Sequence, residues 1–443
     1  MFPNGLLRMN RIQKFAIFYL AALLFLGWGI AIGKYNVFPY SILAGIKNFV
    51  VGDPAEINVS FVDRLMNDFA GKPTRNLKKW KPPEGRDYQQ VTIPGASSSR
   101  GPARIYQNDR SMPGHRLVVG IFDFDEGLHG AILLDESGNV VHKWVLHELG
   151  LDWEVSHPET NKILLGVHPL SDGSLIFTFI NGASIQRFDS SGNRVWATEG
   201  YFNHSVVPDG LGNVWSVGPG NFTGFSKIDI ETGDVEQEVT FESIMKSNPE
   251  LDILGIRQDD SNREWIDQGG GRWHPNDADP LLPELAEHFP QFSVGDLLIS
   301  LRSLNLVFVV DPNSHEIKWW RVGLVRRQHD PDWQPDGSIT IFDNNMHREP
   351  SRIVKVDPKD LSHKVIFDGT DENLYTRNSG NHQMLPNGNI LMTVSQQGRV
   401  VEVTPDGEVA FEFLNTYDAD EDTALPVMEC IYLPEGFFDF KEF

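Results

Sequence analysis

The amino-acid sequence predicts an all-β protein, a six-bladed β-propeller preceded by one N-terminal transmembrane helix and a short stalk. Short alternating apolar runs are separated again and again by Asp-Gly or Asn-Gly turns, which accept the positive φ that tight hairpins require. The hairpins follow a longer repeat that starts with a histidine, and no long amphipathic helical pattern interrupts them. We therefore divide the chain into a cytoplasmic N-terminus with the anchor (1–34), a stalk (35–116) and a propeller (117–443).

The composition excludes several classes of protein. The chain of 443 residues carries a net charge of -23, which repels phosphate backbones and argues against binding of nucleic acid. It has a single cysteine, Cys430, so no intrachain disulfide, thiolate zinc ribbon or thioredoxin-type pair can form.

The N-terminus has the pattern of an uncleaved signal-anchor. Phe15 to Gly33 is an uncharged apolar run, and Arg8, Arg11 and Lys14 precede it without a balancing acid. Such a run spans about 28 Å as a helix, close to the thickness of the hydrocarbon core. A cleaved signal peptide is the alternative, but its apolar region is usually shorter. The positive flank predicts a single-pass protein of the cell inner membrane with the propeller on the periplasmic side.

The stalk is expected to be mostly irregular. Residues 53–69 have an acidic first turn and apolar residues at helical spacing, which predicts a short helix. The segments 77–90 and 93–104 are rich in Pro, Gly and Ser and are typical of linkers.

The repeat predicts the number of blades. Each copy has a histidine, a turn, an apolar strand, a second strand and an outer hairpin; the copies start at His168, His204, His274, His329 and His382. Periods of about 40–55 residues with four strands each are typical of propellers. The longest interval contains an insert at about 241–271. A sixth blade can combine residues 130–144 with the C-terminal strand near 430–438, which would close the ring. Seven blades or a pair of sandwiches remain possible.

The histidines are the first candidate site. If each precedes the innermost strand of its blade, the imidazoles meet at one mouth of the channel. A single repeat-start histidine could equally cap a strand, but five together favour a function. Arginines near them indicate an anion site, because the guanidinium fork matches tetrahedral oxyanions. We expect the substrate-binding residues to be His168, His204, Asn276, Arg302 and Asn344.

Four segments carry a resemblance to a known family: WHPND (273–277), GDLLISLRSLNLVFVVDP (295–312), RRQHDPDWQPDGSITIFDNN (326–345) and SGNHQMLPNGNILM (379–392). Together they resemble the bacterial arylsulfotransferase (aryl-sulfate sulfotransferase) family, over roughly residues 117–430. The resemblance implies a six-bladed propeller that moves a sulfuryl group from an aryl sulfate to a phenol through a sulfated histidine, without a nucleotide donor.

The resemblance also implies the catalytic residues. It assigns His274, His329 and Arg348 to catalysis, and His382 is the candidate for the modified histidine. It implies no cofactor and no metal. The expected partners are an aryl sulfate donor, a phenolic acceptor and the inner membrane, which residues 15–33 would enter. The sequence does not indicate an oligomeric state.

Three other functions remain open. A membrane-tethered propeller can act as a non-enzymatic binding or assembly scaffold. Fragments of the type D-x-x-G-x-x-W, as at Asp189 to Trp196, occur in quinone-dependent dehydrogenase propellers, but in this chain they do not recur in every blade. A histidine metal site would be expected to have a carboxylate in each repeat.

Overall fold

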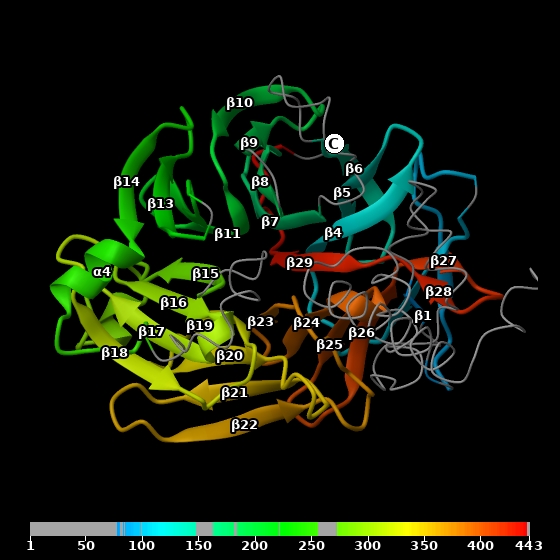
Figure 1. The fold of residues 1–443 in the computed structure, drawn as a ribbon. Helices are drawn as coiled ribbons and strands as arrows, with labels where there is room; N and C mark the ends of the chain where they lie inside the picture. The colour runs from blue at the N-terminus through cyan, green and yellow to red at the C-terminus, as the bar shows by residue number, and fades with distance from the viewer. Residues whose placement is uncertain are drawn as a thin grey trace, which may run out of the picture. The chain divides into compact units, whose positions relative to one another are not determined.

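The computed structural model describes residues 78–79, 83, 85–98, 100–147, 163–180, 184–220, 222–255 and 273–440. They belong to a unit that begins at Gly71. Six antiparallel sheets form a ring in this unit, each with one strand at the centre (Figure 1). The prediction of an all-β propeller with six blades is confirmed, and seven blades or a pair of sandwiches are wrong.

Blades 1 to 4 each consist of four consecutive strands, which follow one another in chain order from the innermost strand to the outermost. Blade 1 contains β7 (Ile163–Pro169), β8 (Leu175–Ile180), β9 (Ser184–Phe188) and β10 (Arg194–Glu199). Blade 2 contains β11 (Asn203–Pro208), β12 (Asn213–Val217), β13 (Gly224–Asp229) and β14 (Val235–Thr240). Blade 3 contains β15 (Pro275–Pro280), β16 (Leu297–Leu301), β17 (Leu306–Val310) and β18 (Ile317–Val322). Blade 4 contains β19 (His329–Trp333), β20 (Ile339–Asp343), β21 (Arg352–Val356) and β22 (His363–Asp368).

Blade 6 joins the two ends of the propeller. The C-terminal strand β29 (Val427–Leu433) is its innermost strand, and it pairs with β4 (His115–Phe124). The outer strands β5 (Gly127–Leu134) and β6 (Val140–Val145) complete the sheet. The predicted closure by residues 130–144 and the C-terminal strand is therefore confirmed.

Blade 5 is larger than predicted. Its inner four strands are β23 (His382–Met384), β24 (Ile390–Val394), β25 (Arg399–Val403) and β26 (Val409–Leu414). Two further strands, β3 (Ala103–Gln107) and β2 (Gln89–Val91), add to its outer edge. These strands lie in the segment predicted to be linker, so the linker prediction is wrong there. Alternate residues of β3 are buried against the sheet. The strand follows directly on a segment rich in Gly, Ser and Pro, and that composition favoured the linker interpretation over the short alternation.

The remaining elements are short. A small sheet contains β1 (Lys78–Lys79), β28 (Thr423–Ala424) and β27 (Thr416–Asp418). The helix α4 (Phe241–Ser247) opens the predicted insert, and Thr240 caps it through the N–H of Ser243. Single 3₁₀ turns are η6 (Ala286–His288), η7 (Arg302–Leu304) and η8 (Ser395–Gln397).

The repeated D-x-x-G-N turns have a structural cause. The side chain of Asp135 accepts the backbone N–H of Asn139 at 2.8 Å, and Gly138 takes a φ of 81°. Asp189 accepts the N–H of Asn193 in the same way at 2.8 Å. An aspartate that accepts backbone N–H groups fixes a tight turn, and glycine accepts the positive φ at no steric cost. These residues form hairpins and carry no chemistry.

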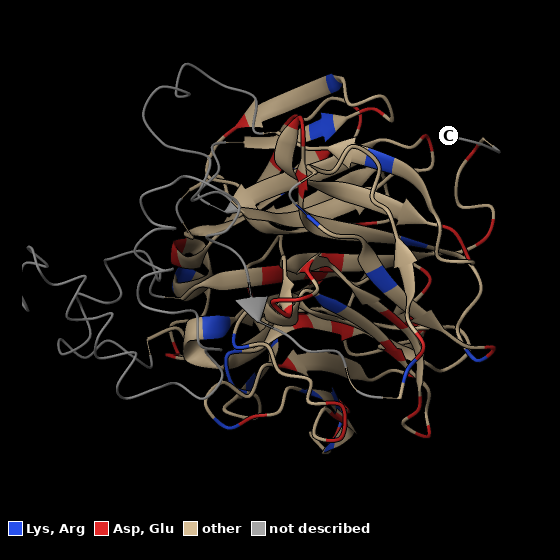
Figure 2. Cartoon of the chain, turned by 90° about the vertical axis from the view of Figure 1, so that its right-hand side faces the viewer, with Lys and Arg blue, Asp and Glu red and all other residues tan. Residues whose placement is uncertain are grey.

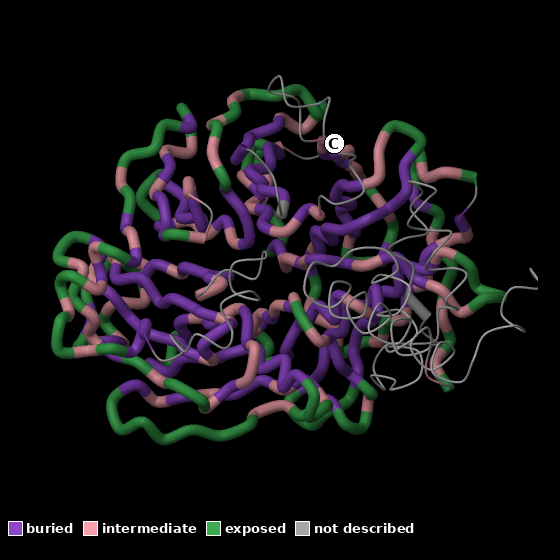
Figure 3. The backbone as a smooth tube through the Cα atoms, viewed as in Figure 1, coloured by how far each residue is buried: buried purple, intermediate pink, exposed green. Residues whose placement is uncertain are grey.

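The hydrophobic core lies between neighbouring blades. One cluster joins Trp215 and Phe225 of blade 2 to Leu297 and Phe308 of blade 3. The inner strands are largely buried, whereas exposed residues follow outer strands such as β10 and β22 (Figure 3). The packed layers between blades therefore hold the six inner strands in place around the channel.

The predicted anchor is not tested by the fold. Residues 15–33, and the helix predicted at 53–69, lie outside the described residues. Within the described ranges, no helix is long and apolar enough to cross a membrane.

Candidate active site

The inner strands enclose two adjoining cavities along the channel. The smaller cavity, of about 80 Å³, is lined by His204, His329 and Asn276 among others. The larger cavity, of about 540 Å³, is lined by His168, His382 and several carboxylates. Both cavities share the residues Ser205, Asp277, Asp330, Asn381 and Glu429.

The backbone is irregular near the channel, and this directs several channel side chains away from the regular alternation of a strand. The ladder of β11 with β12 shifts register between Asn203 and Val206, and that of β19 with β20 shifts between His329 and Pro331. Within or beside such shifts, His204, His274 and Asp330 have φ between 50° and 60°. Positive φ is uncommon for residues other than glycine, and bulges of this kind often aim side chains at functional sites.

His204 lines the smaller cavity and has one ring nitrogen in a hydrogen bond. Its Nδ1 donates a short hydrogen bond to Asn203 Oδ1, so Nε2 has no proton and keeps its lone pair. Among the described residues, Nε2 has no hydrogen-bond partner. Burial lowers the pKa of His204 well below its usual value, and the nearby His274, His329 and Arg302 lower it further. The ring is therefore neutral and nucleophilic near neutral pH.

His274 stands against His204. The two ring centroids are 5.2 Å apart with the rings nearly perpendicular. Phe222 stacks on His274 at 5.2 Å between centroids and also touches the edge of His204. Phe222 thus fixes the relative orientation of two imidazoles from blades 2 and 3.

His329 is held by hydrogen bonds on both nitrogens. Its Nδ1 donates to Asn344 Oδ1 at 2.6 Å, and its Nε2 accepts the N–H of Ser379 at 3.2 Å. Burial lowers the pKa of His329 to about 3, and the charge of Arg302 adds to this. Asn344 donates in turn to the carbonyls of Thr376 and Ser379. Asn344 therefore positions His329. From the sequence we expected Asn344 to bind the substrate itself.

The positive charge of Arg302 lowers the pKa of both His204 and His329. Burial lowers the pKa of Arg302 to about 10, with the charges of Arg327 and Arg377 as further causes. Its Nε is buried without a hydrogen-bond partner. Among the described residues, no carboxylate pairs with its guanidinium. A mostly buried, unpaired guanidinium is unfavourable unless an anion joins it.

Arg348 does not have this setting. It lies on the exposed loop after β20, and only its backbone N–H has a hydrogen bond, to the carbonyl of Asn345 at 2.8 Å. Arg302, and not Arg348, is therefore the arginine whose charge acts on the imidazoles. The reason is local: Arg302 begins η7, directly at the end of β16, with its N–H bonded to the carbonyl of His274.

His382 sits at a different depth from His329. His329 pairs with Phe342, the fourth residue of β20, whereas His382 pairs with Met392, the third residue of β24. The position equivalent to His329 is that of Asn381, whose carbonyl accepts the N–H of the fourth residue of β24. Equal spacing of the histidines from their turns therefore does not give equal places in the channel.

Both nitrogens of His382 are engaged within the protein. Nδ1 lies 2.7 Å from Asp330 Oδ2, and Nε2 lies 2.8 Å from the hydroxyl of Thr340. The side chain has no exposed surface. This environment is less suited to the modified histidine than that of His204.

The other two predicted substrate-binding residues line the cavities. Asn276 donates to the carbonyl of Gln328 at 2.8 Å and leaves its buried Oδ1 without a partner. His168 lines the larger cavity, and burial lowers its pKa to about 4. His204, His274, His329 and Arg302 thus act on one another at one level, while His168 and His382 lie around the larger cavity.

Sequence reasoning missed a group of carboxylates in the larger cavity: Asp277, Asp279, Asp330, Asp332 and Glu429. Burial raises the pKa of Glu429 to about 8, and the charge of Asp330 adds to this. A signal was present, because HPNDADP and HDPDW place aspartates two residues apart, which puts both on one face of a strand. Acidic residues also gather on strands and turns throughout the propeller (Figure 2), so these few do not stand out by charge.

Fold and site together define a six-bladed propeller protein whose inner strands bring the imidazoles of His204, His274 and His329 close enough to act on one another, with the charge of Arg302 acting on His204 and His329. Residues 214–416 match the family model described as Arylsulfotransferase (ASST). The resemblance predicted from the sequence is confirmed over that range, and the match supports an arylsulfotransferase enzyme. The range contains His274, Arg302, His329 and His382, and it begins after His204. No curated protein matches the chain.

Solved structures show only distant similarity. A protein of unknown function from Bacteroides caccae has 12% identity over 72% of this chain and 98% of its own, with a TM-score of 0.48. Virginiamycin B lyase from Staphylococcus aureus has 11% identity over 56% of this chain and 69% of its own, with a TM-score of 0.34. BamB from Moraxella catarrhalis has 12% identity over 74% and 76%, with a TM-score of 0.32. At these values the similarities carry no argument.

Proposed function

We propose that this protein transfers a sulfuryl group from an aryl sulfate to a phenolic acceptor through a sulfohistidine formed on His204. One observation carries the proposal: the charge of Arg302, which is unpaired among the described residues, acts on the imidazoles of His204 and His329, which burial keeps neutral. A sulfate ester is an anion with oxygens that match the guanidinium fork. The family match over 214–416 supports the same donor and acceptor classes.

The state of the ring nitrogens supports His204 as the nucleophile. Its Nε2 has no partner among the described residues, and His204 is one of the residues that line the smaller cavity. His329 uses both nitrogens, and so does His382, the residue that the sequence resemblance indicated. A nitrogen that already accepts a hydrogen bond is a weaker nucleophile than one that faces the substrate.

The reaction has two balanced halves. His204 Nε2 attacks the sulfur of the aryl sulfate, so that an N–S bond forms and the S–O bond to the aryl group breaks. The leaving phenolate takes a proton and departs as a phenol. In the second half, a deprotonated acceptor phenol attacks the same sulfur, the N–S bond breaks and the new aryl sulfate leaves. Arg302 stabilises the charge on the sulfuryl oxygens in both transition states.

His274 is our candidate for the proton transfers. It packs edge-on against His204, 5.2 Å between ring centroids, which makes it the imidazole nearest to the proposed nucleophile and able to exchange protons with a phenol bound there. His329 is less suited, because its pKa of about 3, set first by burial, keeps it unprotonated. General acid–base catalysis of this kind contributes typically about 10²–10⁴-fold.

Membrane attachment is a separate part of the proposal. The uncharged run from Phe15 to Gly33 and the cations Arg8, Arg11 and Lys14 support an inner-membrane anchor, with the propeller in the periplasm.

Intact-mass measurement tests the covalent step. The protein is mixed with p-nitrophenyl sulfate without acceptor, and an adduct of about 80 Da on His204 is expected, because the second half-reaction cannot proceed. His204→Ala should remove the adduct and lower turnover with phenol by at least about 1,000-fold. His382→Ala is the comparison, and it should keep the adduct.

The other outcomes decide between the remaining hypotheses. An adduct that maps to His382 would overturn the role of His204 and leave the enzyme in place. If neither adduct nor acceptor-dependent release of p-nitrophenol is found in the folded protein, the scaffold function is favoured.

A further inference from the structure

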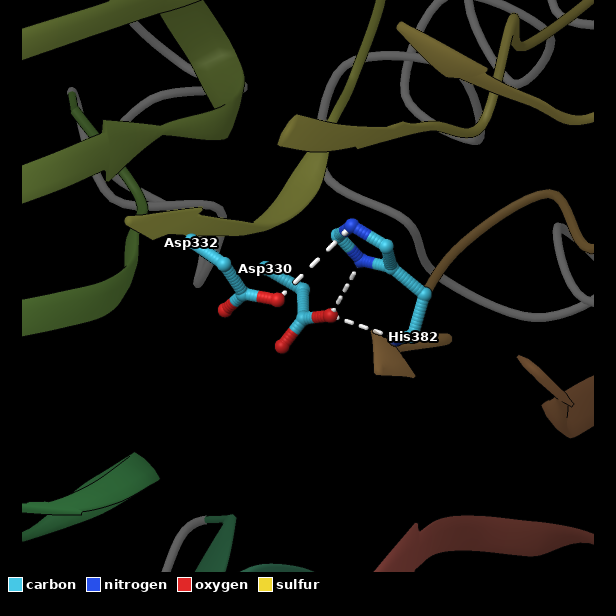
Figure 4. Close-up of side chains that lie close together, drawn as sticks. All are labelled: Asp330, Asp332 and His382. Carbon is cyan, nitrogen blue, oxygen red and sulfur yellow. Dashed lines mark hydrogen bonds and ion pairs between the residues drawn. The ribbon is translucent and has the colours of Figure 1, made fainter. Parts of the chain in front are cut away.

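Three side chains from neighbouring blades converge on the wall of the larger cavity. Asp330 and Asp332 belong to β19, and His382 begins β23 (Figure 4). One ligand atom from each lies within 4.8 Å of the others. We infer that this group binds a divalent transition-metal ion, with His382 Nε2 and Asp332 Oδ2 as ligands. This inference goes beyond the sulfuryl transfer proposed above and does not depend on it.

Asp330 prepares the imidazole for such an ion. Its Oδ2 lies 2.7 Å from His382 Nδ1 and also accepts the backbone N–H of His382. Because a carboxylate accepts, the ring proton is on Nδ1 and the lone pair is on Nε2. A carboxylate that holds the far nitrogen of a histidine ligand is a regular feature of metal sites. Thr340 donates to Nε2 at 2.8 Å in this structure, so binding of an ion requires the Thr340 side chain to adopt another rotamer that moves its oxygen away from the lone pair.

The distance between the two ligand atoms suits one metal ion. His382 Nε2 and Asp332 Oδ2 are 3.7 Å apart. Bonds of about 2.0–2.1 Å to nitrogen and about 2.0–2.2 Å to oxygen allow at most about 4.3 Å between two ligands of zinc. An organic ammonium fits less well, because two hydrogen bonds of about 2.8 Å at a tetrahedral angle place their acceptors about 4.6 Å apart.

Further carboxylates surround the proposed site. They could act as additional ligands, and their negative charge favours a bound cation. Asp277, Asp279 and Glu429 line the same cavity, and no Lys or Arg is among its described lining residues. The charges of all three act on Asp332. Asp277 is buried and the other carboxylates are partly buried, and carboxylates gathered in this way are unfavourable unless a cation or protons compensate their charge.

A second feature independently indicates an absent ligand. Asn276 is 6% exposed, and its buried Oδ1 has no hydrogen-bond partner. The residue lines the smaller cavity together with Asp277, Asp330 and Glu429, which also line the larger one. A buried amide oxygen without a partner is costly, so Asn276 indicates a polar ligand or water molecule in the smaller cavity, which shares Asp330 with the proposed metal site.

The mixture of donors narrows the choice of ion. Imidazole nitrogen with carboxylate oxygen is typical of zinc, manganese and the neighbouring first-row ions, whereas calcium prefers oxygen alone. We therefore expect Zn²⁺ and Mn²⁺ to bind more tightly than Ca²⁺.

The test is metal binding by the full chain, purified without a metal-binding tag and stripped with a chelator. Native mass spectrometry and calorimetry with Zn²⁺, Mn²⁺ or Ca²⁺ alone should give one tightly bound Zn²⁺ or Mn²⁺ per chain. Asp332→Asn should weaken binding by at least about tenfold, and Asp330→Asn by about 10–100-fold as an orienting group. Asp234→Asn, an exposed aspartate on the outer turn of blade 2, is the matched control and should bind as the wild type does.

Two results would overturn the inference. One is wild-type protein that binds no ion at tenfold excess of any of the three metals, which requires no variant to fold. The other is Asp332→Asn protein that binds zinc as tightly as the wild type. Because no aryl sulfate is present, a failure of metal binding is distinct from a failure of the proposed sulfuryl transfer.

Discussion

His204 and His382 both stand at the start of an inner strand, yet their environments differ in polarity. His204 is influenced by two other imidazoles and by Arg302, whereas His382 touches Asp330 and lies near Asp332. A neutral imidazole beside a cation is suited to attack an anionic ester. The carboxylates around His382 repel an anionic ester and attract cations. Residue type alone therefore did not distinguish the two roles.

The pH profile of the sulfation half-reaction tests the role of His204. Burial, His274, His329 and Arg302 all lower the pKa of His204, so its imidazole stays unprotonated as the pH falls through the usual value of about 6.5. We expect kcat/KM for p-nitrophenyl sulfate to stay level down to at least about one unit below that value. The measurement is the rate of p-nitrophenol release with saturating phenol between pH 5 and 9.

Two arginine variants make this test specific. Arg302→Met removes one cause of the lowered pKa, so the acid limb should move to higher pH, and kcat/KM should fall by about 10²–10³-fold. Arg348→Met changes an exposed residue and should leave the limb in place. An acid limb at or above pH 6.5 in the wild type would contradict the assignment.

At the scale of the elements, β29 closes the ring. It brings the C-terminal end of the chain against β4 and buries Val427, Cys430 and Leu433, each at most 4% exposed. Without it, β4 and the neighbouring blades would expose edges and apolar faces. The sixth blade therefore depends on a strand that lies more than 300 residues from its partner in the chain.

Deletion of residues 427–443 is expected to abolish the cooperative unfolding transition or to lower Tm by at least about 10 °C. The reason is the loss of buried apolar side chains, each worth about 1.5–3 kcal/mol, together with the newly opened edge. Calorimetry or circular dichroism measures the transition. Deletion of residues 436–443 keeps β29 and should have a smaller effect; equal effects would show that closure by β29 is not what stabilises the ring.

The sequence predicted the elements better than their register. Asp-Gly and Asn-Gly turns marked the hairpins because a turn is set by a few adjacent residues, as at Asp135 and Gly138. The position of a histidine in the channel depends instead on a register shift, as between Asn203 and Val206, and β23 has no such shift. Local sequence does not reveal a bulge of this kind, because neighbouring strands determine it.

At the scale of the propeller, the channel brings a few cationic groups close to a larger number of carboxylates. The charge of Arg302 acts on the imidazoles of His204 and His329, and the charges of Arg327 and Arg377 act on Arg302. The carboxylates of Asp277, Asp330 and Glu429 line both cavities. In a chain with a net charge of -23, a cationic site at one level is a local exception. An aryl sulfate is therefore expected to bind with its sulfate toward the arginines and away from the carboxylates.

The charge pattern of the whole chain also supports the proposed attachment to the membrane. Arg8, Arg11 and Lys14 precede the apolar run Phe15 to Gly33, and this pattern retains the N-terminus in the cytoplasm. We expect the full chain in the membrane fraction, resistant to extraction with carbonate and released by detergent. Deletion of residues 15–33 removes an apolar run that would span about 28 Å as a helix, and it should move the protein to a soluble fraction. Replacing Arg8, Arg11 and Lys14 with glutamate keeps the apolar run and should change orientation, measured by protease access from the periplasmic side. Two results would show that these residues are not an anchor. One is extraction of the full-length protein by carbonate, and the other is a deletion variant that fractionates as the full-length protein does.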